Sequence, residues 1–361
     1  MRAKYEVLTT RQLNRALLAR QHLLERRAAP LTQVIDDVGG LQTQYAPSGY
    51  ISLWSRMRGF QRDDLTQAME AHQAIHGTLM RVTIHTVSAT DYWPMVAAIR
   101  RSRQQWLLRV TTSQRASLDL ESAAAVLTDI MSDGPRRARE VTSEMTSRGF
   151  ARQAVGWASL WVDIVRIPPS GTWERRANDL YELAERWLPP DAQAGGMPAE
   201  QEGIRFLVGR YLGAFGPARL ADFSDWAGIP LPLVREATHG IELRHFQDER
   251  GRELVDLPDA PLPDPETPAP VRFLPVWDAT LLVHCRRALI LPEHLRPRVF
   301  NVHTPHSVNT FTVDGQVAGT WRYESGELRR QPLRTLSVEE QHEVDEEADR
   351  LTLFHSGDGR A

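Results

Sequence analysis

The amino-acid sequence predicts an α+β fold, mainly α, in which three helical units precede a β-rich C-terminal unit. Helical apolar periodicity followed by short alternating segments recurs at a spacing of about a hundred residues. A proline-rich connector then covers residues 258–270, and an Asp-Gly turn between alternating apolar residues follows it. With 361 residues, 42% of them hydrophobic, the chain can form about two to four compact units.

The first unit, residues 1–115, begins with three helical patterns. Leucines follow a Thr9–Thr10 cap at helical spacing, a second helix begins at Pro30, and Asp63 caps a third. Residues 75–87 then alternate at the period of a strand. Three helices followed by short strands are the order of a winged helix, a member of the helix-turn-helix group.

The next two units repeat this order. In residues 116–188, helical patterns near Glu121 and Arg139 precede a Pro-Pro-Ser-Gly turn that is typical of a wing hairpin. In residues 199–256, a long helix precedes a helix–turn–helix pattern. The sequence therefore predicts tandem winged-helix motifs, although the copies share no obvious identity.

The last unit, residues 271–361, has a different texture. Strand patterns cover residues 273–278, 300–303 and 309–321, and Asp314–Gly315 is a strong hairpin signal. An acidic amphipathic helix is expected near the C-terminal end.

The short stretch from Val38 to Pro47 is the candidate functional centre. A helical pattern leads into it, Pro47 is expected to stop the helix, and Gln42 and Gln44 stand one residue apart. Residues two apart do not share a helix face, but in an extended backbone they point the same way. If the helix breaks at the second glutamine, both amides can converge on one bound object. Glutamine is no base near pH 7, so the chemistry would be positioning and dipole stabilisation. The alternative is that the two glutamines solvate a helix end.

Charge is distributed unevenly along the chain, whose net charge is -3. Residues 1–120 contain 16 Lys and Arg against 9 Asp and Glu, which favours a localised surface for a polyanion. Arg56, Arg58 and Arg81 are the candidate phosphate contacts, and His85, on the polar side of its strand, is a further surface contact. The alternative is that these arginines pair with neighbouring acids on a solvated surface.

Composition also limits the compartment and the cofactors. Cys285, the single cysteine, excludes an internal disulfide and a multi-cysteine metal site, and the apolar residues before it predict a core thiol. No apolar run is long enough to span a bilayer, and polar helical sequence follows the start. We therefore expect a cytoplasmic protein with no membrane partner.

Five segments taken together resemble one known family. They are Leu41–Gln44, Leu53–Arg56, Leu79–His85, Pro275–Asp278 and Val313–Trp321. In these segments the chain resembles bacterial winged-helix DNA glycosylases of the crosslink-unhooking, AlkZ/YcaQ type, and the likeness covers nearly the whole chain in order. The resemblance implies tandem winged helices joined to a C-terminal β-barrel-like domain and curved around DNA.

The resemblance also implies a reaction and its residues. Gln42 and Gln44 match the catalytic Gln-apolar-Gln motif of one branch, with Thr43 in the apolar middle place, where a leucine is expected to be neutral or mildly activating. The implied enzyme is a monofunctional hydrolase that cleaves the N-glycosidic bond of an N7-alkylated purine, with a water held by the two amides. It needs no cofactor and no metal. Its partner is alkylated or crosslinked double-stranded DNA. A C-terminal hairpin, with Arg322 nearby, is expected to contact this DNA. The protein is expected to be a nucleoid-associated monomer.

Two other classes of protein remain open from the sequence. One is a noncatalytic winged-helix DNA-binding protein or transcriptional regulator, because the fold does not decide function. The other is a peroxidase or hydrolase that uses histidines, of which four lie near each other in sequence: His284, His294, His303 and His306. Their spacing is not that of metal ligands, so solvated loops are the expected explanation.

Overall fold

Three separate sheets organise the described part of the chain, which covers residues 5–111, 119–282, 288–300 and 307–357 of a computed structural model. A six-stranded sheet has the order β2-β4-β3-β6-β7-β5, a three-stranded sheet has the order β1-β8-β9, and a four-stranded sheet has the order β10-β11-β12-β13. The six-stranded sheet joins the first and second helical units, because β3 pairs with β6. Cys285 and three of the four histidines considered above, His284, His303 and His306, lie outside the described residues.

The first unit has the element order helix, strand, helix, helix, strand, strand. Its elements are α2 (Leu31–Asp37), β2 (Leu41–Gln42), α3 (Ala46–Arg56), α4 (Arg62–Glu70), β3 (Ala74–Thr78) and β4 (Ile84–Ser88). A short 3₁₀ turn, η1 (Met80–Val82), lies between the last two strands. The helices expected at Pro30 and Asp63 are confirmed. The strand pattern of residues 75–87 forms β3 and β4, but Arg81 lies in the turn between them and not in a strand, and β2 and α3 were not predicted.

The expectation that Pro47 stops a helix is wrong. Helix α2 ends at Asp37, and Gly39 and Gly40 then take positive φ values of 76° and 84°, which turn the chain into β2. Pro47 instead lies in the first turn of α3. A proline costs nothing there, because its missing N–H would have no partner inside the helix.

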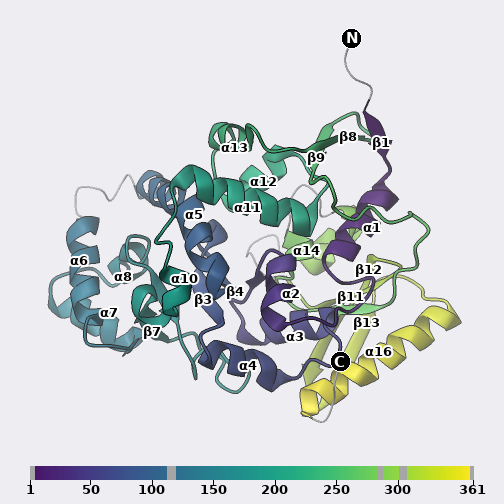
Figure 1. Cartoon of the computed structure of the whole chain (residues 1–361). Helices are drawn as coiled ribbons and strands as arrows, with labels where there is room; N and C mark the ends of the chain where they lie inside the picture. The colour runs from purple at the N-terminus through teal and green to yellow at the C-terminus, as the bar shows by residue number, and fades with distance from the viewer. Residues whose placement is uncertain (1–4, 112–118, 283–287, 301–306, 358–361) are drawn as a thin grey trace.

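The second unit repeats the element order after a long connecting helix, α5 (Ala89–Val110), which was not predicted. Its elements are α6 (Leu120–Met131), β5 (Arg136–Arg137), α7 (Ala138–Ser147), α8 (Ala154–Ala158), β6 (Ile164–Arg166) and β7 (Leu180–Leu183). The expected Pro-Pro-Ser-Gly turn lies in the loop between β6 and β7. Figure 1 shows this unit on the left, beside the first unit.

The third unit has the same order again. Two short helices, α9 (Ala184–Trp187) and α10 (Pro190–Gln193), precede it. It contains α11 (Glu200–Phe215), a bridge between Ala218 and Val255, α12 (Leu220–Ala227), α13 (Leu231–Thr238), β8 (Arg244–Asp248) and β9 (Glu253–Asp256). Helix α11 packs across α5 so closely that a Cβ on Gly203 would lie 2.7 Å from the Ala98 nitrogen, and only glycine fits.

The C-terminal unit is an open antiparallel sheet covered by a helix. Its elements are β10 (Arg272–Leu274), α14 (Ala279–Leu282), η4 (Glu293–Leu295), α15 (Arg296–Val299), β11 (Thr310–Val313), β12 (Gln316–Glu324), β13 (Glu327–Pro332) and α16 (Val338–Ser356). The predicted Asp314–Gly315 hairpin and the terminal helix are confirmed. No closed barrel is found among the described residues, because β10 and β13 remain the two edges of the sheet. Of the strand expected at residues 300–303, the structure describes only Phe300, in a bridge with Ser307.

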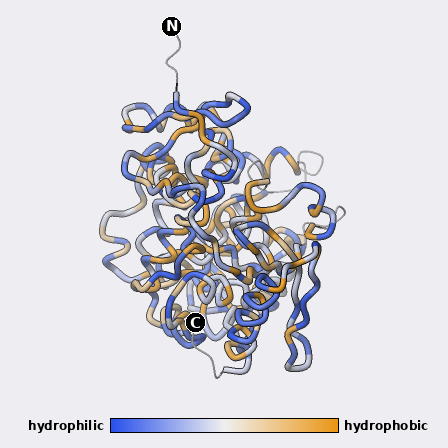
Figure 2. The backbone as a smooth tube through the Cα atoms, turned by 90° about the vertical axis from the view of Figure 1, so that its right-hand side faces the viewer, coloured by the Kyte–Doolittle hydropathy of each residue, from blue (hydrophilic) through white to orange (hydrophobic). Residues whose placement is uncertain are grey.

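Residues 6–20 lie with the later units. Strand β1 (Glu6–Leu8) pairs in parallel with β8, and α1 (Thr10–Arg20), capped by Thr9 as predicted, reaches the C-terminal sheet. At its end, Arg20 forms a buried ion pair of 2.7 Å with Asp256. Figure 2 shows hydrophobic segments gathered inside the molecule and hydrophilic segments on its outer turns.

Candidate catalytic site at the end of strand β2

Gln42 and Gln44 lie side by side at the end of β2. The Gln42 amide donates a hydrogen bond from Nε2 to Oε1 of Gln44, with a length of 3.0 Å. Gln42 is the last residue of the strand and only 9% exposed, whereas Gln44 is exposed. The extended backbone places both amides on one side, as the alternation of a strand requires. Their convergence thus comes from a strand rather than from the expected break in a helix.

Arg81 determines which way both amides point. Its Nη2 donates to Oε1 of Gln42 over 3.2 Å, and its Nη1 donates to the carbonyl of Trp226 in α12. Because a guanidinium can only donate, Gln42 must turn its carbonyl toward Arg81 and its NH₂ toward Gln44. Gln44 must then accept with its carbonyl. A chain of donors therefore runs from Arg81 through the buried amide to the exposed one.

Arg81 was expected to contact phosphate, and the structure gives its side chain different partners. The turn that carries it is unusual: Arg81 and Val82 have φ values of 54° and 59°, a region that non-glycine residues rarely adopt. Burial lowers the pKa of Arg81 to about 10, so the side chain remains cationic at neutral pH. The side chain is partly buried, and its charge is held against the carbonyls of Gln42 and Trp226.

His85 lies behind the same pair and is not a surface residue, so the expected surface contact is wrong. It is the cross-strand partner of Gln42 and is 4% exposed. Its Nδ1 is 3.1 Å from the carbonyl of Thr83. Burial, followed by the charge of Arg81, lowers the pKa of His85 to about 3. The imidazole is therefore neutral near pH 7 and too weak a base to take a proton from water.

Thr43 packs into the wall behind the amides. It is fully buried, and its Oγ1 accepts a hydrogen bond of 3.0 Å from the hydroxyl of Thr86. Helix α3 approaches it closely, since a Cβ on Gly49 would lie 2.9 Å from its methyl group. A larger apolar residue at position 43 would overpack this wall and remove the acceptor of Thr86. We therefore no longer expect a leucine here to be neutral or activating.

The loop between β6 and β7 of the second unit borders the exposed side of the site. Asn178 Nδ2 lies 3.4 Å from the backbone carbonyl of Gln44, and Arg176 Nη1 donates to the hydroxyl of Tyr45 over 3.0 Å. Sequence reasoning missed Tyr45, Arg176 and Asn178. Residues 45 and 176 are 131 positions apart, and no spacing pattern marks them.

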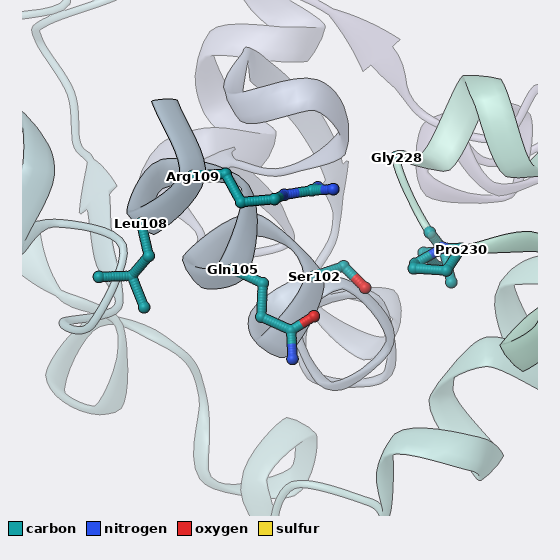
Figure 3. Close-up of a pocket in the computed structure, with 7 residues that line it drawn as sticks. Ser102, Gln105, Leu108, Arg109, Gly228 and Pro230 are labelled. Atoms are coloured by element: carbon teal, nitrogen blue, oxygen red, sulfur yellow. The ribbon is translucent and has the colours of Figure 1, made fainter. Parts of the chain in front are cut away.

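A cavity of about 610 Å³ opens near the inner end of the donor chain. Figure 3 shows Ser102, Gln105 and Arg109 of α5 on one side of it, with Gly228 and Pro230 opposite. Arg81 binds the carbonyl of Trp226, two residues before Gly228. The cavity is lined by neither glutamine. Among the described residues, no group of three or more His, Cys, Asp or Glu side chains is arranged to hold a metal ion.

Comparison with known proteins identifies the family. The sequence profile described as DNA glycosylase AlkZ-like matches residues 35–354. The chain belongs to the AlkZ-like DNA glycosylase family. Its partner is therefore DNA, and it acts in DNA repair. The fold is similar to that of the Streptomyces sahachiroi DNA glycosylase AlkZ, with a TM-score of 0.78, 19% sequence identity and 98% of each chain covered. No curated protein sequence matches the chain.

Two of the segments that suggested the AlkZ-like family form one buried ion pair. Arg56, at the end of α3, is 1% exposed and binds both carboxylate oxygens of Asp278 at 2.9 and 3.0 Å. Burial by itself raises the pKa of Asp278, but Arg56 and the hydrogen bonds from Thr280 outweigh it and leave that pKa below its ordinary value. The expected phosphate contact of Arg56 is wrong, because the pair is enclosed between α3 and the C-terminal unit.

The remaining arginines of the sequence prediction are exposed. The side chain of Arg58 is 60% exposed beside Glu25, and that of Arg322 is 63% exposed and 3.4 Å from Glu324. The Asp314–Gly315 turn also contacts α1, because Asp314, whose side chain is 53% exposed, pairs with Arg11 and Arg15. No helix of the described residues is long and apolar enough to cross a membrane.

Proposed function

We propose that this AlkZ-like glycosylase hydrolyses the N-glycosidic bond of N7-alkylated purines in double-stranded DNA, and that it acts through Gln42 and Gln44. The observation that carries the proposal is the oriented donor chain from Arg81 through Gln42 to Gln44, which ends on an exposed amide. Amides that only solvated a chain turn would need no such fixed orientation. Preorganised dipoles of this kind stabilise charge that develops in a transition state.

The reaction needs little catalytic assistance from the protein. An N7-alkylated purine is cationic, so the C1′–N9 bond can break with its electron pair going to the base, and the sugar becomes oxocarbenium-like. The second lone pair of the Gln44 carbonyl faces this positive charge or accepts a hydrogen bond from the attacking water. The water oxygen bonds to C1′, and its proton passes to solvent. Neutral His85 and both amides are too weakly basic to be a general base.

A purely hydrolytic reaction also suits the composition. Cleavage of the strand after base release by a Schiff base requires an amine nucleophile. The chain contains one lysine, Lys4, far in sequence from the two glutamines. We infer a monofunctional enzyme.

The openness of the site supports large substrates. Gln44 and Tyr45 are both exposed, so the reacting amide is not enclosed in a pocket that must hold the whole base. We infer that a purine attached to a second strand can reach Gln44, which would permit the unhooking of interstrand crosslinks.

The repeated element order supports the proposed mode of DNA binding. Helix, strand, helix, helix, strand, strand occurs three times, with the first strand of each unit paired to the last. In the second unit this is β5 on β7. We infer three winged-helix modules. We also infer that Arg58 and Arg322 contact phosphates, because each gives up only a weak, exposed ion pair with a glutamate when it binds one.

The test is base release from a duplex that holds one N7-methylguanine, read as alkali-induced strand breaks. Gln42→Ala and Gln44→Ala should each slow release about a hundredfold, since one well-placed dipole is worth roughly 3 kcal/mol. Gln44→Leu should behave like the alanine variant, whereas Gln44→Glu should be milder because a carboxylate stabilises a cation. Gln67→Ala, which removes an exposed amide of α4, is the control.

Two results would change the assignment. Full excision by the Gln42→Ala/Gln44→Ala double variant would place the chemistry elsewhere. Tight DNA binding by the wild type without any base release would favour the noncatalytic DNA-binding protein.

A further inference from the structure

Tyr45 is an aromatic ring left open beside the reacting amide. It directly follows Gln44 and is 39% exposed. The exposed large hydrophobic side chains of the described residues include only two aromatic rings, Tyr45 and Trp106. An aromatic ring stabilises a protein or a complex mainly when it is buried. An exposed ring beside a catalytic group therefore suggests a surface that a ligand covers.

The ring of Tyr45 is held in place before any ligand arrives. Arg176 binds its hydroxyl, and the guanidinium carbon lies 5.9 Å from the centroids of both the Tyr45 and the Trp173 rings. Trp173 is buried, so its contact with the guanidinium ties Arg176 to the protein interior. The loop that carries Arg176 also contacts the Gln44 carbonyl through Asn178. A ring fixed in this way loses little conformational freedom when it stacks on a partner.

The charge around the ring indicates a nucleic-acid partner. Asp179, in the same loop, pairs with Arg137 and Arg175, and no ion pair of Arg176 occurs in the part of the chain that the structure describes. A flat apolar face next to an unneutralised exposed cation matches a nucleotide, which offers a flat base and a phosphate.

We propose that the exposed face of Tyr45 is a stacking site for the nucleobase adjacent to the damaged nucleotide, with Arg176 holding the ring and facing the neighbouring phosphate. The proposal rests on the proposed function to the extent that Gln44 marks the position of the reacting nucleotide. Stacking there would keep the duplex in register while the damaged nucleotide meets the two amides. The competing role for Tyr45 is simple support of Arg176 through its hydroxyl.

The experiment measures binding without base release. The full chain is titrated into a duplex that carries a tetrahydrofuran abasic analogue in place of the damaged nucleotide, with 2-aminopurine beside it. The affinity and the quenching of 2-aminopurine fluorescence are recorded for Tyr45→Phe, Tyr45→Leu and Tyr45→Ala. Tyr45→Phe keeps the ring and its contact with the Arg176 guanidinium and loses one hydrogen bond, so it should still quench and bind nearly as well as the wild type. Leu and Ala should lose the quenching and bind about 5- to 150-fold more weakly.

The outcomes separate the two roles. Trp106→Ala, which removes the other exposed aromatic ring, is the matched control and should leave both readouts unchanged. Wild-type affinity for Tyr45→Ala, an equal loss for Tyr45→Phe, or no quenching by the wild type would each overturn the proposal. Because the probe cannot be cleaved, stacking can be observed even if N7-methylguanine is not released, so failure of the proposed function is recognised separately.

Discussion

Replacing Arg81 by methionine tests whether this side chain orients the catalytic amides. The variant keeps much of the side-chain volume but leaves the Gln42 carbonyl and the Trp226 carbonyl without their donor. The Gln42 amide is then free to turn over, and Gln44 loses its fixed partner. A hydrogen bond from a charged donor is worth about 1.5–3 kcal/mol, so base release should slow by roughly 10- to 160-fold.

The assay separates orientation from DNA binding. Single-turnover release of N7-methylguanine gives the rate, and a duplex titration at several salt concentrations gives the affinity. An orienting residue lowers the rate and leaves the salt dependence unchanged, whereas a phosphate contact lowers the log–log salt slope by about one. Arg58→Met is the matched control, because Arg58 is an exposed side chain that is proposed to contact phosphate. A salt slope reduced by Arg81→Met, with a normal rate at saturating enzyme, would refute the donor chain.

Four further substitutions test buried and exposed contacts. Thr43→Leu should lower the melting temperature, by an overpacking cost of about 1–3 kcal/mol, and slow base release, because Thr86 loses its acceptor; an unchanged melting temperature and rate would contradict this. Arg56→Met should cost about 3–5 kcal/mol in urea denaturation, because it leaves Asp278 buried without its cation; a loss below about 1 kcal/mol would show a pair of little consequence. In the wild type the folded pKa of Asp278 lies below its unfolded value of about 3.9. Its contribution to the free energy of unfolding is therefore present above that pH and is lost as the pH falls through the folded pKa. Asp278→Asn should lack this acid-dependent loss of stability. Arg322→Gln should reduce the salt slope of duplex binding by about one without changing the melting temperature; an unchanged slope would exclude the phosphate contact.

Local patterns in the sequence were enough to predict most elements. The Thr9 cap of α1, the Asp314–Gly315 hairpin and the terminal helix depend on side chains within a few residues of each other, and all three are confirmed. Family membership agrees with the resemblance found in the sequence. That Gln42 and Gln44 share one side also follows from local geometry, since residues two apart align in any extended backbone.

Helix α3 shows where local patterns stop being sufficient. Pro47 can end one helix or begin another, and the residues around it permit both. The choice depends on Gly39 and Gly40, whose left-handed conformations end α2 early, and on the packing of Thr43 against Gly49. Neither the conformation of these glycines nor this packing contact leaves a recognisable pattern in the sequence.

The roles of the arginines were decided only by the tertiary structure. Sequence establishes that Arg56 and Arg81 carry positive charge and that the region around them is basic. It cannot show that Asp278, 222 residues away, reaches Arg56, or that the Trp226 carbonyl takes one arm of Arg81. An arginine is available to DNA only if no buried acceptor already holds it. Its acceptors are set by how distant helices and strands pack, because burying a charge is tolerated only where such a partner is already in place.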